Sequence, residues 1–179
     1  MSKVLVVVDM QNDFVTGVLH NEEAIKIVPS VAAKVKKALE DMDTTIIFTK
    51  DTHGANYLET EEGKNLPVVH CVKGTHGWYL IPELENYASV AQIIEKNTFG
   101  SLDLINRLTG IVSTTNQDLE YIEFVGVCTD ICVVSNALLV KANFPNVHLK
   151  CDSSCCAGVT PEKHEAALET MRSCQIEVI

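Results

Sequence analysis

The sequence predicts an α/β fold: a doubly wound, three-layer α/β/α domain around a mostly parallel six-stranded sheet. Six short apolar or β-branched runs recur along the chain, and segments with helical spacing lie between them. Such alternation favours right-handed crossovers, parallel strands and helices on both faces. The chain has 179 residues, 46% of them hydrophobic, so we expect one domain spanning residues 1–179.

The six runs are continuous rather than alternating, as expected of strands buried on both faces of a parallel sheet. The first begins almost at the start of the sequence. In order, the runs are Val4–Val8, Thr45–Thr49, Val90–Glu95, Tyr121–Val127, Val147–Cys151 and, with a less regular pattern, Gln175–Ile179.

Helical spacing is seen in three segments. In the first, apolar residues recur every three or four positions, at Ile25, Val28, Val31, Val35 and Leu39. The other two are 131–142 and 162–173. Residues 51–89 contain four glycines and two prolines that break any long element, and long loops in compact domains usually bind or cover something.

Net charge and cysteine content limit the partners and the cellular compartment that we expect. The net charge is −10, which would repel a phosphate backbone, so we expect no nucleic-acid partner. The sequence contains no run of about 18 apolar residues, and no charged and apolar leader comes ahead of the first strand pattern. We therefore expect no membrane partner and a cytoplasmic location. The seven cysteines fit reduced thiols better than disulfides or a thiolate metal cluster. Four are interpreted as packing residues: Cys151, Cys155, Cys156 and Cys174.

Polar residues follow the predicted strands, where open α/β sheets bind their ligands. Asp9 follows the first strand and Lys96 the third. Lys50, Asp51 and His53 follow the second, and residues 128–132 follow the fourth. We therefore expect an acid, a lysine, a thiol and metal-type ligands at one rim of the sheet.

Cys132 has the best setting for a nucleophile. Thr129 can cap the following helix, which would place Cys132 in its first turn, where the helix dipole favours a thiolate. First-turn N–H groups can also point at a developing oxyanion. Asp9 can accept the thiol proton, and Lys96 can hold developing charge. The alternatives are an inert buried cysteine and a structural ion pair.

A metal site is the second candidate. Alternation along an extended backbone sends Asp51 and His53 to one face, where His70 can join them and Glu62 can be a fourth ligand. Nitrogen and carboxylate donors suit zinc, iron or manganese. The alternative is a set of ordinary surface polar residues.

Four aromatic residues can border a flat substrate. Phe14 and Phe99 lie close in sequence to Asp9 and Lys96, so we expect them to form walls of the site. Trp78 and Tyr57 can reach in from the long excursion. Core packing is the alternative for each.

With these residues in place, the chain resembles the isochorismatase-like cysteine hydrolases, and within them the nicotinamidase and pyrazinamidase group. The resemblance covers essentially the whole chain. It rests on blocks in the right order, at residues 7–14 (VVDMQNDF), 51–53 (DTH), 70–75 (HCVKGT), 96–99 (KNTF) and 126–133 (GVCTDICV).

The resemblance implies a triad of Asp9, Lys96 and Cys132 that hydrolyses a small amide, with release of ammonia and a thioester intermediate. It selects Cys132 over Cys128 as the nucleophile. It also implies a cis peptide between Val127 and Cys128, with an oxyanion hole formed by the amides of Cys128 and Cys132.

In nicotinamidases an Asp and two His hold a metal that meets the pyridine nitrogen, which implies that role for Asp51, His53 and His70. The remaining ligand is a His or a Glu, and no histidine lies between His53 and His70. Glu62 is our choice, with Glu61 and Glu59 as rivals. Zinc is the expected ion, with iron or manganese as alternatives.

The leading hypothesis is thus deamidation of nicotinamide or a close heteroaromatic amide. The alternatives are a metal-free hydrolase of another small amide or carbamoyl compound, and a non-catalytic ligand-sensing relative. The resemblance further implies a homo-oligomer, most simply a dimer. The expected partner is a small-molecule amide substrate, with no organic cofactor.

Overall fold

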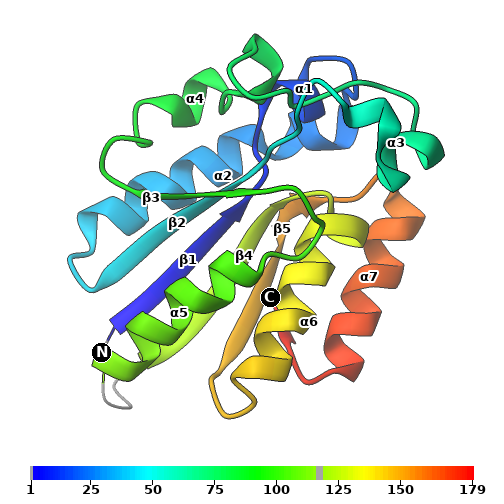
Figure 1. Cartoon of the computed structure of the whole chain (residues 1–179). Coiled ribbons are helices and arrows are strands. Elements are labelled where there is room, and N and C mark those ends of the chain that lie inside the picture. Colours follow the sequence, from blue (N-terminus) through cyan, green and yellow to red (C-terminus); the bar gives the residue numbers. More distant parts are fainter. Residues whose placement is uncertain (1, 116–118) are drawn as a thin grey trace.

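The computed structural model of the chain describes residues 2–115 and 119–179. Six parallel strands form one sheet in the order β3-β2-β1-β4-β5-β6 (Figure 1), which confirms the predicted fold class. The strands are β1 Ser2–Val8, β2 Thr44–Asp51, β3 Gln92–Lys96, β4 Leu119–Val127, β5 Leu149–Ala157 and β6 Glu177–Val178.

Helices cover both faces of the sheet (Figure 1). One face carries α5 Leu102–Thr114, α6 Val134–Asn143 and α7 Pro161–Ser173, and the other carries α1 Asn12–Val15, α2 Glu22–Glu40 and α4 Pro82–Glu85. In β1, Val4, Val6 and Val8 pack toward the first set, whereas Leu5 and Val7 pack toward the second. The continuous apolar run therefore serves two cores.

Local sequence explains where the longest helix begins. The side chain of Asn21 accepts a hydrogen bond from the N–H of Glu23, and two acidic residues lie in the first turn of α2. Both features stabilise a helix N-terminus. Ala24, Ile27, Val31 and Val35 then form the buried face.

Three of the longer elements differ most from the sequence prediction. Helix α5, which Ser101 caps by accepting the N–H of Leu104, was not predicted. Strand β3 begins at Gln92, and Val90 is 68% exposed because it lies in the preceding turn. Strand β5 begins at Leu149 and continues to Ala157 through a bulge, since Phe124 pairs with Cys151 while Gly126 pairs with Cys156.

The long excursion after β2 folds into short pieces over the carboxyl ends of the strands (Figure 1). These pieces are η1 Tyr57–Glu59, α3 Glu61–Asn65, η2 His76–Trp78 and α4. Isolated bridges between His53 and Val72 and between Gln11 and Leu80 tie the excursion to residues that follow β2 and β1. It is thereby fixed beside the rim where the polar residues gather.

All seven cysteines are free thiols. Cys151, Cys155 and Cys156 are buried as packing residues, but Cys174 is exposed, so its interpretation as a packing residue was wrong. The reason is that Cys174 caps the end of α7, after the last buried residue of that helix.

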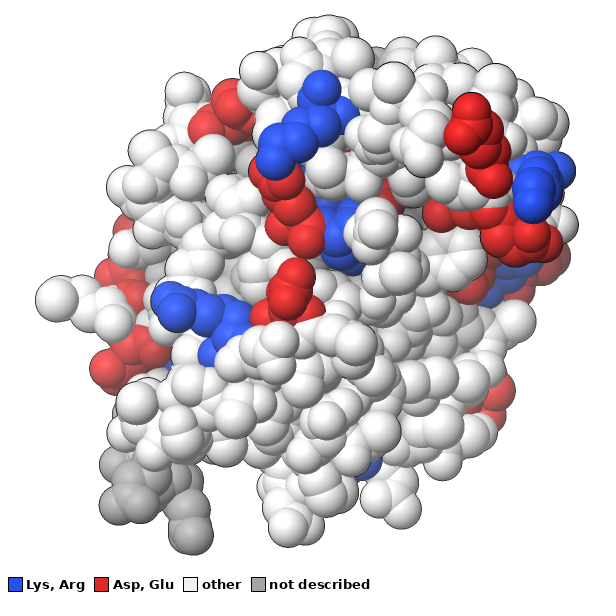
Figure 2. Space-filling view, in the orientation of Figure 1, with Lys and Arg blue, Asp and Glu red and all other residues white. Residues whose placement is uncertain are grey.

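Acidic and basic side chains are intermixed on the face that Figure 2 displays. Within residues 2–115 and 119–179, no helix combines the length and the apolar character needed to span a bilayer.

Candidate active site

The three residues of the expected triad meet at the carboxyl ends of three strands. Asp9 follows β1, Lys96 ends β3, and Cys132 lies in the π-helical turn η3, Thr129–Val133, after β4. The Lys96 Nζ lies 2.6 Å from Asp9 Oδ2 and donates to Cys132 Sγ at 3.5 Å. All three side chains are buried. The expected convergence is confirmed as geometry.

Burial controls the protonation of this group. It raises the pKa of Asp9, and the positive charge of Lys96 offsets this only in part. Burial and the negative charge of Asp9 raise the pKa of the Cys132 thiol well above its usual range. Burial alone would lower the pKa of Lys96, but the negative charges of Asp9 and Asp51 raise it above its usual range. The resting site therefore holds a thiol and an ammonium.

The expectation of a dipole-stabilised resting thiolate was therefore wrong. Desolvation and the adjacent Asp9 carboxylate outweigh the partial charge at the start of the helix. The raised pKa of Asp9 makes its carboxylate a stronger base, which suits removal of the thiol proton at the moment of attack.

The expected capping role of Thr129 was also wrong. The residue before η3 is Cys128, and the Thr129 hydroxyl is instead 2.8 Å from His164 Nδ1 on α7. Asp130 Oδ1 accepts the N–H of Val159 at 2.9 Å, in the loop before α7. The nucleophile turn is thus held by side-chain hydrogen bonds to α7 and its preceding loop rather than by a side-chain cap at its own N-terminus.

The backbone just before Cys132 has the implied form. The Val127–Cys128 peptide is cis, as expected, and the N–H of Cys128 donates no hydrogen bond to any described residue. Gly126 has a φ of +115°, and a Cβ there would lie 2.2 Å from the carbonyl oxygen of Val8. Only glycine lets β4 pass so close to β1, which brings Cys128 and Asp9 to the same site.

Next to the triad, Asp51, His53, Glu62 and His70 form a compact cluster. One ligand atom from each lies within 4.8 Å of the others. Asp51 Oδ2 lies 2.9 Å from His53 Nε2 and 3.4 Å from His70 Nε2, while Glu62 Oε1 lies 3.7 Å from both imidazole nitrogens. Of the three candidate glutamates, Glu62 is the one the fold brings in. Glu61 and Glu59 are exposed.

The chemistry of this cluster fits a divalent cation. Two imidazole nitrogens and two carboxylates match common zinc donor types, and the four ligand atoms lie close enough together to share one ion. His70 Nδ1 donates to the carbonyl of Val68 at 2.7 Å, which leaves Nε2 available as a ligand. Burial alone would raise the pKa of Asp51, but His53, His70 and Lys96 bring it well below its usual range, so it is an anionic donor.

Two residues that the sequence did not single out hold this cluster of candidate ligands in place. Gln11 clamps the backbone of Asp51, accepting its N–H at 2.7 Å and donating to its carbonyl at 2.8 Å. Asp13 Oδ2 accepts the N–H of Cys71, beside His70, at 2.8 Å. Both side chains are buried. The signal for them in the sequence was their spacing, because polar residues occur at every second position from Asp9 to Gln11 and Asp13.

A third such residue, Asn136 on α6, connects the triad elements. Its Nδ2 donates to the carbonyls of Cys132 at 2.8 Å and Phe99 at 3.0 Å, and its Oδ1 accepts the N–H of Ser101 at 2.9 Å. Asn136 is fully buried. No feature of the sequence around it signalled this role.

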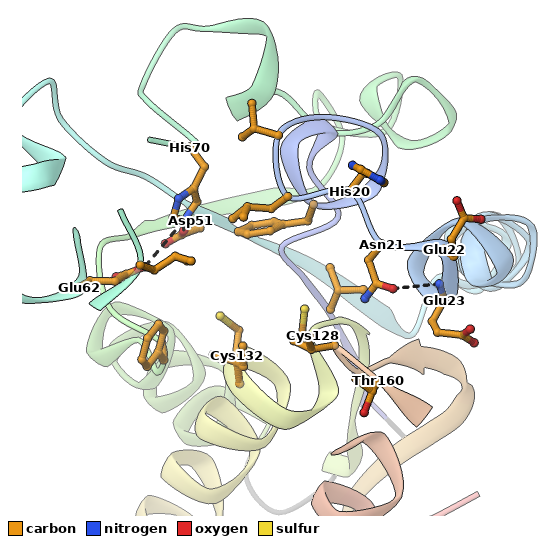
Figure 3. Close-up of a pocket in the computed structure, with 18 of the residues that line it drawn as sticks. His20, Asn21, Glu22, Glu23, Asp51, Glu62, His70, Cys128, Cys132 and Thr160 are labelled. Atoms are coloured by element: carbon orange, nitrogen blue, oxygen red, sulfur yellow. Dashed lines mark hydrogen bonds and ion pairs between the residues drawn. The ribbon is translucent and has the colours of Figure 1, made fainter. Parts of the chain in front are cut away.

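A cavity of about 700 Å³ opens over these groups (Figure 3). Cys132, Asp51, Glu62 and His70 line it, together with the expected Phe14 and Phe99. Tyr57 is buried and packs edge-on against His53 and His70 instead. Trp78 lies outside the cavity lining, with its ring 3.1 Å from Lys50 Nζ, so its expected reach into the site was wrong. Lys50 holds it beside β2.

Comparison with known proteins identifies the family. The Isochorismatase domain matches residues 3–179. The chain belongs to the isochorismatase family. It is 28% identical to a nicotinamidase of Schizosaccharomyces pombe, covering 98% of this chain and 91% of that protein. It is 26% identical to a nicotinamidase/pyrazinamidase of Mycobacterium tuberculosis, covering 99% and 98%.

A solved structure has a similar fold. The pyrazinamidase of Pyrococcus horikoshii in complex with zinc superposes with a TM-score of 0.83 at 29% identity, covering 100% of this chain and 99% of that one. The chain is therefore an amide-bond hydrolase by family and fold.

Proposed function

We propose that this isochorismatase-family protein is a nicotinamidase, converting nicotinamide and water to nicotinate and ammonia. One observation carries the proposal: Cys132, which contacts the buried Asp9–Lys96 pair through Lys96, lines the same cavity as Asp51, Glu62 and His70 of the donor cluster. The named relatives act on the same class of small heteroaromatic amide. Phe14 and Phe99 line that cavity and would flank the ring.

In the first half-reaction, Asp9 takes the proton of the Cys132 thiol as Sγ attacks the amide carbon. The backbone N–H groups of Cys128 and Cys132 stabilise the oxyanion. Asp9 then gives the proton to the nitrogen, the carbon–nitrogen bond breaks, and ammonia leaves behind a thioester. Lys96 holds Asp9 and Cys132 in position and balances the negative charge that develops during the reaction.

In the second half-reaction, Asp9 removes a proton from water, whose oxygen attacks the thioester carbon. The same N–H groups stabilise the second oxyanion. The carbon–sulfur bond breaks, nicotinate forms, and the proton returns to Cys132. The raised pKa of Asp9 suits a group that must accept and release a proton in each half-reaction.

The proposed ion is zinc, held by Asp51, His53, Glu62 and His70, with iron or manganese as alternatives. When bound, it would act as a Lewis acid toward the pyridine nitrogen and orient the ring. This donor set favours a nicotinamidase over a metal-free carbamoyl hydrolase. The complete triad disfavours a non-catalytic ligand sensor. The seven free thiols support a reducing, cytoplasmic setting as part of the proposal.

The direct test is ammonia release from nicotinamide by metal-replete protein, compared with Cys132→Ser. We expect activity in the wild type and a loss of at least roughly a thousandfold in the variant. Cys174→Ser, which changes an exposed thiol away from the site, is the matched control and should retain full activity. Equal activity in Cys132→Ser would contradict the assignment, and no activity in the wild type would redirect the search to carbamoyl and other small amides.

A further inference from the structure

The active-site cavity extends well past the triad and the metal donors. Its volume of about 700 Å³ lies within the roughly 300–1,000 Å³ of pockets that enclose drug-sized ligands. In Figure 3, Asp51, Glu62 and His70 lie on one side, Cys132 and Cys128 lie below the centre, and Asn21, Glu23 and Thr160 lie on the other side. A single-ring amide at the metal donors and Cys132 leaves this far part unfilled. We name it the distal arm, lined by segments 18–23 and 159–161 with Cys128.

The distal arm is a built part of the fold. One wall is the segment that enters α2, and the other is the loop between β5 and α7. Asn21 joins them, since its Nδ2 donates to the carbonyl of Gly158 at 2.7 Å while its Oδ1 accepts the N–H of Glu23 at 2.9 Å. A Cβ on Gly158 would lie 2.8 Å from the backbone nitrogen of His164, so this loop lies tightly against α7. Both walls are therefore fixed in relation to Cys132.

The lining of the arm selects a class of ligand. Val18 is 58% exposed and Val159 is 44% exposed, and with Leu19 and Pro161 they give the arm apolar walls. The charged groups at this end include the carboxylates of Glu22 and Glu23. No lysine or arginine is among the described residues that line the cavity. Such a lining accepts an apolar group, neutral or cationic, and repels an anionic one.

The order of groups along the cavity decides which half of a substrate the arm would take. The metal donors and the distal arm lie on opposite sides of Cys132 (Figure 3). A molecule that occupies both therefore has its reactive carbonyl between its two ends. With the acyl ring at the metal donors, the other end is the group carried by the amide nitrogen.

We propose that the distal arm binds the amine half of a secondary amide, so that the protein hydrolyses N-substituted heteroaromatic amides with an apolar, neutral or cationic substituent. This inference rests on the proposed amidase function. Cys132 Sγ bonds to the acyl carbon, the carbon–nitrogen bond breaks, and the amine leaves with the proton from Asp9. Water then hydrolyses the thioester, which gives the carboxylic acid and restores the thiol.

The test compares nicotinamide with N-benzylnicotinamide, both of which yield nicotinate, by chromatography of that product. We expect the wild-type kcat/KM for the benzyl amide to lie within roughly tenfold of that for nicotinamide. Val159→Trp should fill the arm and lower the ratio of benzyl amide to nicotinamide kcat/KM by at least roughly tenfold. Val90→Trp changes an exposed valine outside the cavity and should leave that ratio unchanged.

The outcomes separate the two proposals. Hydrolysis of nicotinamide without hydrolysis of the benzyl amide overturns the distal-arm proposal and leaves the proposed function standing. Hydrolysis of the benzyl amide alone supports the arm and corrects the substrate. Activity on neither amide overturns the proposed function and this inference with it. An equal loss on both substrates in Val159→Trp contradicts a role for the arm in substrate choice.

Discussion

At the scale of single residues, the site works through groups whose charge is set by their neighbours. Asp9 is buried, and its carboxylate accepts the hydroxyl of Thr49 at 2.7 Å and pairs with Lys96 at 2.6 Å. Lys96 also lies 3.7 Å from Asp51 Oδ1, so one ammonium faces both the triad and the metal donors. Removing any one of these charges changes the protonation of the others.

Asp9→Asn tests the proton-transfer role without changing the size of the side chain. We expect kcat to fall by roughly a thousandfold, because general acid–base catalysis typically contributes 10²–10⁴. Asp103→Asn, an exposed carboxylate in the first turn of α5, is the control and should have normal kcat. Steady-state ammonia release measures both. A fall below about tenfold in Asp9→Asn would assign the proton transfer to another group.

The pH profile follows from the raised pKa of Asp9. Catalysis needs the carboxylate. A raised pKa means that protonation begins at higher pH than for an ordinary aspartate, whose pKa is about 3.9. We therefore expect kcat/KM of metal-replete enzyme to fall on the acid side with an apparent pKa above that value. An acid limb at or below about 4 would show that burial does not dominate at Asp9.

The choice of Glu62 as the fourth donor is tested by metal content. We expect Glu62→Gln to bind zinc at least about tenfold more weakly than the wild type, because it loses an anionic donor. Competition with a chromogenic chelator measures the affinity. Glu61→Gln is the matched control, since Glu61 is 84% exposed and pairs with Lys64, and its affinity should be unchanged. Equal affinities in the two variants would remove Glu62 from the site.

At the scale of elements, the nucleophile turn depends on contacts with other parts of the chain. Thr129 and Asp130 attach η3 to α7 and its preceding loop, and Asn136 on α6 attaches it to the loop after β3. The segment after β1 likewise attaches to the backbone beside the candidate metal ligands, through the side chains of Gln11 and Asp13. The site is therefore assembled by buried side-chain to backbone hydrogen bonds between elements.

Asn136→Ala should destabilise the protein by about 2–3 kcal/mol, because the buried N–H of Ser101 loses its side-chain acceptor and the carbonyls of Phe99 and Cys132 lose the bonds that Nδ2 donates. We also expect a lower kcat, since Cys132 and the loop after Lys96 lose their connection. Urea unfolding and ammonia release are the measurements. Asn143→Ala, an exposed asparagine near the end of the same helix, should stay within about 0.5 kcal/mol. Equal stabilities would contradict a structural role for Asn136.

At the scale of the whole molecule, a partly buried ionic cluster lies on the opposite face of the sheet from α6. Lys34 on α2 contacts both Glu123 on β4 and Asp152 on β5, the latter at 2.5 Å. Burial alone would lower the pKa of Lys34, but the two carboxylates raise it above its usual range. Burial likewise opposes ionisation of Asp152, yet Lys34 lowers its pKa. This cluster joins α2 to two central strands.

Lys34→Met leaves two buried carboxylates without a countercharge, so we expect a loss of about 2 kcal/mol near pH 7.5. Because Asp152 has a lowered pKa in the folded wild type, its contribution is present above the unfolded pKa and is lost as pH falls through the folded value. The difference between wild type and variant should therefore be full near pH 7.5 and shrink toward about pH 3, below the unfolded pKa of about 3.9. Urea unfolding at both pH values checks this. Lys36→Met, on the exposed side of α2, should show no such difference.

The sequence by itself determined the fold class and the meeting of the main candidate residues at one edge of the sheet. Continuous apolar runs such as Val4–Val8 required strands buried on both faces, and the alternation with helical segments required parallel pairing. Residues that follow parallel strands must meet at one edge, so Asp9, Lys96 and Cys132 were predictable as neighbours. These inferences depend only on local periodicity and chain direction.

The tertiary structure alone decided the charge states, the choice among donors and the shape of the cavity. Burial raised the pKa of Cys132 where a local dipole argument predicted a thiolate. The fold of α3 selected Glu62 over Glu61, and Thr129 bonded to His164 rather than capping its own helix. The physical reason is that desolvation, long-range hydrogen bonds and cavity shape depend on which distant segments pack together. Local sequence patterns carry no record of that packing.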